Sequence, residues 1–242
     1  MSETLMTISN VSKSFGDVNA LRSISLEIKS GEVVGLVGSN GAGKTTLLRL
    51  MSGVYKPTSG TVCLDDGTPV DKMRQRLGVV PESTGLYSRL TAWENIRYHS
   101  RMHGVSDKDS WSRTSRFAKH LDMLENLGRH TKGFSRGMRQ KTALLRALAH
   151  GPSVLLLDEP TNDLDVNTLR ALEEGLENFG GCAVIISHDR WFLDRVCTHI
   201  LAFEGDSQVY FFEGGYSDYE ENRKKRLGDV GPTRIRYKKL VR

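Results

Sequence analysis

Short apolar runs recur along the chain and predict β-strands, because apolar runs bounded by turn residues are typical of buried strands. Between them, apolar residues at helical spacing predict helices, as at 45–51 and 169–179. Strands that alternate with helices predict an α/β fold with a mostly parallel sheet that helices cover on both faces. The predicted strands lie at 5–8, 23–28, 33–37, 61–64, 77–80, 154–157 and 182–186.

The segment from about residue 85 to residue 150 has a helical pattern throughout. Thr91 and Glu94 have the spacing of a capping box and predict the start of one helix. Phe117 begins an apolar stripe that predicts a second, amphipathic helix. The stripe of this second helix consists of Phe117, Leu121 and Leu124. A third helix is predicted over 136–150, with Leu144, Leu145 and Leu148 on its apolar side. Beyond this segment, Leu169, Leu172, Leu176 and Phe179 predict a helix that Asp165 can cap.

These patterns divide the chain into three parts. An α/β core is predicted over 1–84 and 151–220, and the helical subdomain over 85–150 is inserted into it. Within the core, residues 12–16 are interpreted as a turn that presents one aromatic side chain. Residues 221–242 are interpreted as a basic C-terminal tail.

A glycine-rich stretch at 38–45 fits the pattern G-x-x-x-x-G-K-[ST] and lies between a predicted strand and a predicted helix. Glycines let successive backbone N–H groups turn around phosphate oxygens, and the helix N-terminus adds partial positive charge. Lys44 can reach the β- and γ-phosphates, and the Thr45 hydroxyl can bind Mg²⁺. A glycine turn with an incidental lysine is the alternative. The predicted nucleotide-binding residues are Gly38, Ser39, Asn40, Gly41, Ala42, Gly43, Lys44, Thr45 and Thr46.

Two acidic residues follow the apolar run at 154–157. Asp158 is expected to hold Mg²⁺ directly or through water, and Glu159 is expected to orient and polarise the attacking water. A solvated acidic turn is the alternative. The glycine loop, this acidic pair and His188 all follow predicted strands, so we expect them at one edge of the sheet, where α/β folds bind ligands.

Composition and charge indicate where in the cell the protein is expected and how its charge is distributed along the chain. The chain has 242 residues with a net charge of +5, no apolar run long enough to cross a membrane, and no signal-peptide pattern at its start. Its three cysteines lack metal-ligand spacing, which favours a reducing cytoplasm. Residues 221–242 hold nine Lys or Arg against two acidic residues, so this tail carries +7 and the rest of the chain −2.

The order of these motifs resembles the ATPase subunit of ATP-binding cassette (ABC) proteins over nearly the whole chain. The resemblance implies a P-loop fold with a mixed, largely parallel core sheet, antiparallel N-terminal strands and a helical insert. It implies that Phe15 stacks on adenine and that His188 senses the γ-phosphate. Glu82 stands where most members place a glutamine that contacts the metal and the water, and a glutamate there departs from the pattern. A core or surface aromatic and a core histidine are the alternative interpretations for Phe15 and His188.

Residues 134–140 resemble the ABC signature and 162–165 resemble the loop after the catalytic carboxylate. A serine at a helix start offers a hydroxyl, backbone N–H groups and the helix dipole to a phosphate. In the family this second site faces the ATP of another subunit, which implies an ATP-dependent homodimer or heterodimer. A plain helix cap is the alternative for the serine. The implied signature residues are Ser135, Arg136, Gly137 and Met138, and the implied dimer-loop residues are Asp163 and Asp165.

The front of the chain resembles cassettes of drug, sodium and polysaccharide exporters and of cytochrome c maturation, through 80–87 and 134–140. The last third, through 158–165, 186–195 and 211–220, resembles the ABC-F family of translational-throttle ATPases. We therefore expect a hybrid joined between about 140 and 158.

Three functions follow from this twofold resemblance. The first is an exporter ATPase subunit that docks on membrane-spanning subunits, at the inner face of the cell membrane, through the surface near Glu82 and the helical insert. The second is an ATPase that meets ribosomes or RNA through the basic tail. The third is a free-standing P-loop ATPase or kinase. A solvated terminus is the alternative interpretation of the tail.

Overall fold

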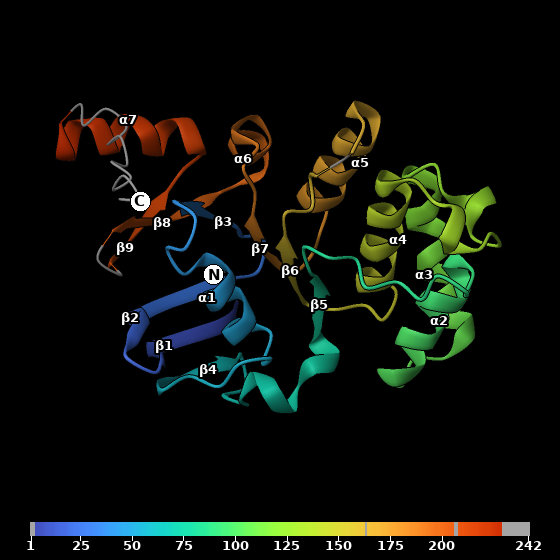
Figure 1. Ribbon diagram of the computed structural model, residues 1–242, viewed down its shortest axis with the longest axis horizontal. Coiled ribbons are helices and arrows are strands. Elements are labelled where there is room, and N and C mark those ends of the chain that lie inside the picture. The colour runs from blue at the N-terminus through green and yellow to red at the C-terminus, as the bar shows by residue number, and fades with distance from the viewer. Residues whose placement is uncertain (1–2, 163, 206–207, 229–242) are drawn as a thin grey trace, which may run out of the picture.

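A computed structural model of the chain describes residues 3–162, 164–205 and 208–228 (Figure 1). Its centre is a six-stranded sheet in the order β5-β6-β7-β3-β8-β9. The first five of these strands are parallel, and β9 is antiparallel to β8 at one edge. This is the mixed, largely parallel sheet that the sequence predicts. The strands are β3 (Val33–Gly38), β5 (Leu77–Val80), β6 (Val154–Asp158), β7 (Cys182–Ile186), β8 (His199–Gly205) and β9 (Gln208–Glu213).

The inner strands of this sheet are apolar on both faces because helices or a second sheet cover each face. Every residue of β6 and β7 is buried. Val34 of β3 pairs with Val184 on one side and with His199 on the other, so β3 lies in the middle of the sheet. Strands that are buried on both sides read as continuous apolar runs, which explains why the sequence revealed them.

A second, antiparallel sheet in the order β2-β1-β4 packs against one face of the molecule's core. The helix α1 lies between the two sheets, and its buried side chains contact both (Figure 1). Antiparallel N-terminal strands are therefore confirmed. These elements are β1 (Thr4–Phe15), β2 (Val18–Lys29), β4 (Ser59–Leu64) and α1 (Lys44–Met51).

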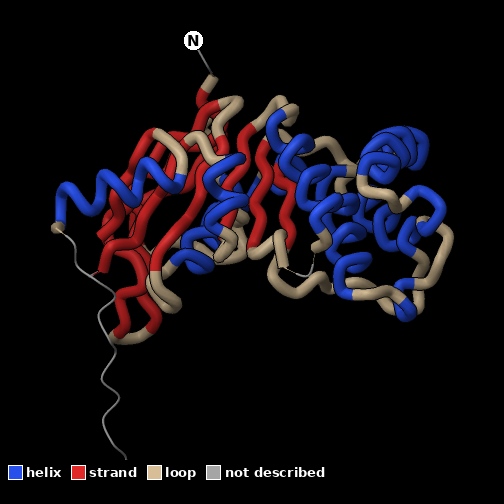
Figure 2. Tube along the Cα trace, turned by 90° about the horizontal axis from the view of Figure 1, so that it is seen from above, coloured by secondary structure: helices blue, strands red, loops and turns tan. Residues whose placement is uncertain are grey.

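Between β5 and β6 the chain forms three helices that share a small core of their own. Figure 2 shows these helices gathered at one end of the molecule, beyond the strands. The predicted capping box at Thr91 and Glu94 is confirmed, since each residue's side chain accepts a hydrogen bond from the other's backbone N–H. The helices are α2 (Ala92–Met102), α3 (Asp107–His120) and α4 (Arg136–Leu148), and short 3₁₀ turns lie at Val70–Lys72, Arg74–Arg76, Leu124–Asn126 and Thr131–Gly133.

The other face of the central sheet is covered by α4 and by three helices from the last third of the chain. Asp165 caps the first of them, as the sequence predicts: its carboxylate accepts from the Thr168 backbone N–H at 3.0 Å and from the Thr168 hydroxyl at 2.7 Å. The helices are α5 (Val166–Glu177), α6 (Arg190–Val196) and α7 (Tyr216–Leu227).

Several local predictions are wrong. Residues 12–16 are not a turn, since β1 continues through Phe15 and the turn begins at Gly16, whose φ is 57°. Leu124 does not extend the preceding helix, because α3 ends at His120 and Asp122 has a left-handed φ of 52°. Local apolar spacing carries no information on such backbone reversals.

Other elements begin or end away from their predicted limits. Four were not assigned from the sequence at all: α6, β8, β9 and α7. The apolar run at 200–203 could have revealed β8. α7 runs across the boundary predicted between 220 and 221. No described helix is long and apolar enough to cross a membrane.

Candidate nucleotide site

The predicted site residues converge because their strands are neighbours. β6, β7 and β3 lie side by side, and the acidic pair, His188 and the glycine loop follow their carboxyl ends. The side chains reach one another: His188 contacts Glu159, and both carboxylates act electrostatically on Lys44. The arrangement gathers a cation, two acids and an imidazole at one edge of the sheet.

Glycine is required in the loop by both conformation and space. Gly38, Gly41 and Gly43 have φ values of 142°, 80° and 109°, which side-chain-bearing residues rarely adopt. A Cβ at Gly43 would lie 2.7 Å from the Leu21 Cδ2 and 2.8 Å from the Ala20 carbonyl oxygen. The loop can therefore hold its shape only with glycine there. Ser39, Asn40 and Gly41 are exposed at its tip, whereas Ala42, Thr45 and Thr46 are half-buried.

The Lys44 ammonium lies inside this loop. Its Nζ donates hydrogen bonds to the carbonyl oxygens of Gly38 at 2.7 Å and Ser39 at 2.9 Å. Burial lowers the pKa of Lys44, while the negative charges of Glu159 and Asp158 oppose that shift. A phosphate group bound in the loop would compete with the two carbonyls for the ammonium. The buried Lys44 ammonium therefore favours the binding of an anion in the glycine loop.

Asp158 is a buried acid whose environment is suited to a cation. Burial raises its pKa, the charge of Glu82 raises it further, and Arg49 and Lys44 oppose these effects. Glu82 itself is exposed in the segment after β5. A bound Mg²⁺ would relieve the repulsion between Asp158 and Glu82, and oxygen donors are the ligands it prefers. The donor set of Thr45, Asp158 and Glu82 therefore fits the ion by chemistry.

Glu159 and His188 form a pair. The His188 backbone N–H donates to Glu159 Oε2 at 3.3 Å, and the His188 Nε2 lies 3.3 Å from Glu159 Oε1. Burial raises the pKa of Glu159, and His188 opposes the shift. Glu159 also has a φ of 51°, a left-handed conformation that costs free energy in a residue other than glycine. The fold therefore holds this carboxylate in a strained position beside an exposed imidazole.

A pair of hydroxyls links the loops that follow β6 and β7, which the sequence did not reveal. The Thr161 and Ser187 hydroxyl oxygens lie 2.8 Å apart, and Ser187 Oγ also accepts from the Asp189 backbone N–H at 3.0 Å. Asp189 in turn caps α6 through the Phe192 backbone N–H. The segments that carry Glu159 and His188 are thus tied together by side chains outside the predicted set.

Phe15 lies at the end of β1 with nearly half of its surface exposed. Tyr55 meets it edge to face, with ring centroids 5.5 Å apart, and Lys13 Nζ lies 5.1 Å from the Phe15 ring. Tyr55 is on the loop after α1, so the glycine-loop helix and the aromatic residue are held together. The open ring suits stacking on a base, and Tyr55 is a neighbour that sequence reasoning missed.

The signature residues line an open depression of about 410 Å³ at the start of α4. Ser135 Oγ accepts from the Met138 backbone N–H at 3.2 Å, which makes it the helix cap. Asp165 reaches the same depression, with Oδ2 3.6 Å from Lys141 Nζ. The pKa of Asp165 is lowered to about 2, mainly because its carboxylate accepts hydrogen bonds from Thr168 and to a smaller extent because of the charge of Lys141. Arg136 and Gly137 complete the lining, and Asp163 lies outside the described residues.

This depression is separate from the glycine loop, since no described residue of 38–46 lines it. The predicted signature residues therefore line a depression to which Lys44 does not contribute. Another cavity, of about 600 Å³ between α3, α4 and α5, is lined by none of the described residues of either arrangement.

Comparisons with known proteins agree with this geometry. A family model described as ABC transporter matches residues 21–162. Energy-dependent translational throttle protein EttA of Haemophilus influenzae is 40% identical over 250 residues, which cover 100% of this chain and 43% of EttA. ABC transporter ATP-binding protein NatA of Bacillus subtilis is 36% identical over 238 residues, which cover 93% of this chain and 96% of NatA. The chain thus spans less than half the length of the EttA proteins it matches.

Two solved structures share the fold. The structure of an ATP-binding subunit of an ABC transporter superposes with a TM-score of 0.82 at 24% identity, covering 93% of this chain and 95% of that one. A dimeric ATP-binding cassette bound to ADP and Pi, in a post-hydrolysis state, superposes with a TM-score of 0.75 at 27% identity, covering 86% of this chain and 98% of that one. Both confirm the expected fold, and the relatives confirm a resemblance in two directions.

Proposed function

The chain belongs to the ABC transporter family of P-loop ATPases, and from that premise we propose that it is the ATP-binding and ATP-hydrolysing subunit of an exporter. The observation that carries the hydrolytic role is the meeting of Lys44, Asp158, Glu159 and His188 at the ends of β3, β6 and β7. ATP is the substrate, and Mg²⁺ is the proposed cofactor. The cytoplasmic face of a membrane is the proposed location.

The residues divide the work of hydrolysis. Lys44 and the loop N–H groups hold the β- and γ-phosphates, and Phe15 stacks on the adenine. Thr45 and Asp158, with Glu82 acting on Asp158, would hold Mg²⁺, and the bound ion would neutralise developing charge on the phosphate oxygens. Glu159 orients the water that attacks the γ-phosphorus, and His188 fixes the position of the Glu159 carboxylate. The new P–O bond forms as the bond to the β-phosphate oxygen breaks, and ADP and phosphate leave.

A second copy of the chain, or a related subunit, completes the site in this proposal. The depression at Ser135 offers a helix N-terminus and a hydroxyl to a phosphate that its own loop does not supply. Asp165 and Lys141 border it, so the predicted dimer loop and the signature lie together. Two chains would then enclose two ATP molecules, each held by the glycine loop of one and the signature of the other.

We expect the Glu159→Gln protein to double its mass in light scattering when ATP and Mg²⁺ are added, because blocked hydrolysis preserves the bridging nucleotide. Ser135→Asp should prevent this dimer, since aspartate still caps α4 but repels the γ-phosphate. Ser135→Thr, which keeps both the cap and the hydroxyl, is the matched control. A Glu159→Gln protein that stays monomeric at high concentration with ATP and Mg²⁺ would argue against the shared site.

An exposed aromatic patch supports the exporter role. Tyr87 and Tyr98 meet edge to face with ring centroids 5.8 Å apart, and together with Met102 they expose half or more of their surfaces. The patch lies on α2 and on the segment that begins at Glu82, where a moving partner could sense the nucleotide. Exposed apolar patches of this kind mark docking surfaces. The extended likeness to NatA, an ABC transporter ATP-binding protein, points the same way.

A second candidate function rests on α7 and the 40% identity with EttA, a translational throttle protein. The exposed face of α7 carries Arg223, Lys224 and Lys225, and five further Lys or Arg lie in 229–242, outside the described residues. In this alternative the basic C-terminal residues meet ribosomal RNA phosphates. Two of these basic residues have acidic partners: Lys225 pairs with Glu221, and Arg226 pairs with Glu204 and has its guanidinium carbon 3.6 Å from the Tyr210 ring centroid.

Fractionation separates the two candidates. We expect the chain to be retained by a membrane fraction that contains transporter subunits, and Tyr98→Ser with Met102→Ser to reduce that retention by removing apolar contact. Val54→Thr, an equally exposed apolar site on another element, is the control. Co-sedimentation with ribosomes tests the alternative, with a chain cut after Gly228 so that α7 stays intact.

The outcomes point in opposite directions. Ribosome binding that is lost on truncation and falls steeply with salt would replace the exporter proposal. The binding constant should fall by about 0.7–0.9 log units per log unit of salt for each phosphate contact. Retention by the membrane fraction that Tyr98→Ser with Met102→Ser leaves unchanged would remove the patch from the docking surface. Neither result bears on the ATPase itself.

A further inference from the structure

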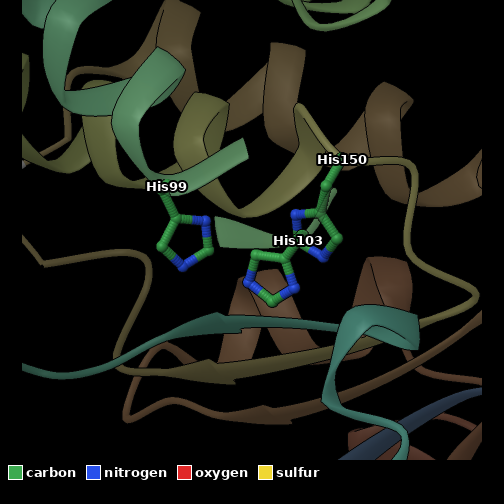
Figure 3. Close-up of side chains that lie close together, drawn as sticks. All are labelled: His99, His103 and His150. Atoms are coloured by element: carbon green, nitrogen blue, oxygen red, sulfur yellow. The ribbon is translucent and has the colours of Figure 1, made fainter. Parts of the chain in front are cut away.

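Three histidines gather where the helical insert meets the central sheet (Figure 3). His99 and His103 are one helical turn apart at the end of α2, so their side chains lie on the same face. His150 comes from the turn after α4, and its ring stacks on that of His103. Ring centroids lie 4.6 Å apart for His99 and His103, 5.7 Å for His99 and His150, and 4.2 Å for His103 and His150.

The hydrogen bonds of His150 fix the state of its ring. Nε2 lies 3.0 Å from the Leu77 carbonyl oxygen, which can only accept, so Nε2 carries the proton. In the neutral ring Nδ1 is then an unprotonated acceptor that is buried without a hydrogen-bond partner of good geometry among the described residues, while the Arg146 backbone carbonyl also acts on the ring. A histidine that donates one ring N–H to a backbone carbonyl and keeps the other nitrogen free is arranged as metal-binding histidines are.

His99 repeats the same deficiency. Its Nδ1 is also buried without a partner in the described part of the chain. Figure 3 shows the rings around a common space, to which His99 and His150 each present a nitrogen. Two buried ring nitrogens without hydrogen-bond partners in one place are costly, because each has lost its hydrogen bond to water. A ligand that accepts electron pairs would satisfy both at once.

The surroundings keep the imidazoles neutral, which is the form that binds metals. Burial first, and then the charge of His103, lower the pKa of His150 to about 4 and that of His99 to about 3. Burial also lowers the pKa of His103. The charge of Arg146 disfavours protonation of His99, and the charge of Arg113 disfavours protonation of His150. Both guanidinium groups are turned to carbonyl oxygens, Arg146 to those of Thr84 and Gly85 and Arg113 to that of Ala149.

We propose that His99, His103 and His150 form a binding site for a divalent transition-metal ion of the nitrogen-preferring class, with Zn²⁺ as the ion tested. One donor atom from each ring already lies within 4.8 Å of the others. Three nitrogens around a tetrahedral zinc ion are about 3.3 Å apart, so the rings must close by up to about 1.5 Å. The His103 ring is nearly parallel to that of His150, with an interplanar angle of 12°, so it must also turn; His103 follows α2 as its C-cap and is only half-buried, so its side chain can make that movement.

The site differs in chemistry and place from the Mg²⁺ site proposed at Thr45 and Asp158. Imidazole nitrogens favour zinc, copper and nickel, whereas carboxylate and hydroxyl oxygens favour magnesium. Through His150 and the Leu77 carbonyl, a bound ion would join α2 to the α4–β6 turn and to β5. It would thereby fix the helical insert against the sheet that carries Asp158.

The test is titration of metal-free, tag-free full-length protein with Zn²⁺ by calorimetry in excess Mg²⁺, which occupies oxygen sites. We expect one equivalent of Zn²⁺ to bind, and His103→Gln to weaken binding at least about 100-fold because it removes a ligand. His120→Gln, at an exposed histidine on α3, is the matched control and should bind as the unmodified chain does. Zn²⁺ should also raise the melting temperature of the unmodified chain and not that of His103→Gln.

Two further measurements keep the result decisive. His99→Gln provides a second ligand variant on α2, and an ATPase rate equal to that of the unmodified chain shows that each variant is folded. Co²⁺ in place of Zn²⁺ should give the visible absorption of a nitrogen-ligated tetrahedral ion in the unmodified chain and in His120→Gln, and not in His99→Gln or His103→Gln. Absence of stoichiometric Zn²⁺ binding, or binding that both glutamine variants retain, would reduce the cluster to three packed imidazoles.

Discussion

Replacing Glu159 by glutamine is expected to lower the rate of ATP hydrolysis by about 10²–10⁴-fold while ATP still binds. Glutamine has the shape of glutamate and can keep the contact with the His188 backbone N–H, but it cannot accept a proton from water. Burial raises the pKa of Glu159, so the carboxylate is a stronger base than an exposed glutamate. Steady-state phosphate release measures the loss, and nucleotide affinity measures what is kept.

The control for that experiment is Glu125→Gln, which makes the same chemical change at an exposed position on a 3₁₀ turn. It should leave turnover unchanged. Because Glu159 has a left-handed φ, glutamine at this position inherits the same backbone strain and the comparison isolates the carboxylate. Turnover at the unmodified rate in Glu159→Gln would assign the activation of water to another residue.

Replacing Lys44 by alanine is expected to weaken ATP binding at least about 100-fold, which corresponds to about 2.7 kcal/mol. The Lys44 ammonium is buried inside the glycine loop beside Asp158 and Glu159, so it is the charge that offsets both the phosphates and the two carboxylates. Without it, three groups of like charge would share one site. Equilibrium titration with a fluorescent ATP analogue gives the affinity.

Lys108→Ala removes the same charge from an exposed position on α3 and should bind ATP as the unmodified chain does. The comparison separates the local role of the ammonium from any effect of net charge. If Lys44→Ala binds ATP within a few-fold of the unmodified affinity, the glycine loop and helix dipole alone hold the phosphates, and the assignment of Lys44 fails.

The sequence predicts that the glycine loop, the acidic pair and His188 lie at one edge of the sheet, because each of them is encoded by a local pattern. A glycine loop between an apolar strand and a helix, or two acids after a fully apolar run, needs no knowledge of distant residues. The three predicted sites meet because β6, β7 and β3 are neighbours, and that follows from the rule that parallel strands end at one edge. The structure brings these residues together, and the role of each site residue remains a prediction.

The remaining features depend on contacts between residues far apart in the chain. Tyr55 beside Phe15 and Thr161 beside Ser187 bring together loops whose separation no local pattern describes. His150 meets His99 only because α4 returns to the sheet next to β5, so the histidine cluster has no signature in the sequence beyond one pair at helical spacing. Strand β1 illustrates the limit on boundaries: its register shifts near Asn10, whose φ is 51°, and the sequence pattern predicted only residues 5–8 of it.

The position of β3 also governs how the protein can fold as it is synthesised. Its two partners, β7 and β8, are encoded far later than β3 itself, whereas the β2-β1-β4 sheet and the helical insert are built mostly from nearby segments. A nascent chain that has emerged only as far as α4 holds those local units, but the apolar edges of β3 are still unpaired. The central sheet can therefore close only after β8 has emerged from the ribosome. Until then the unpaired edges of β3 favour association between chains, which a chaperone that covers them would prevent.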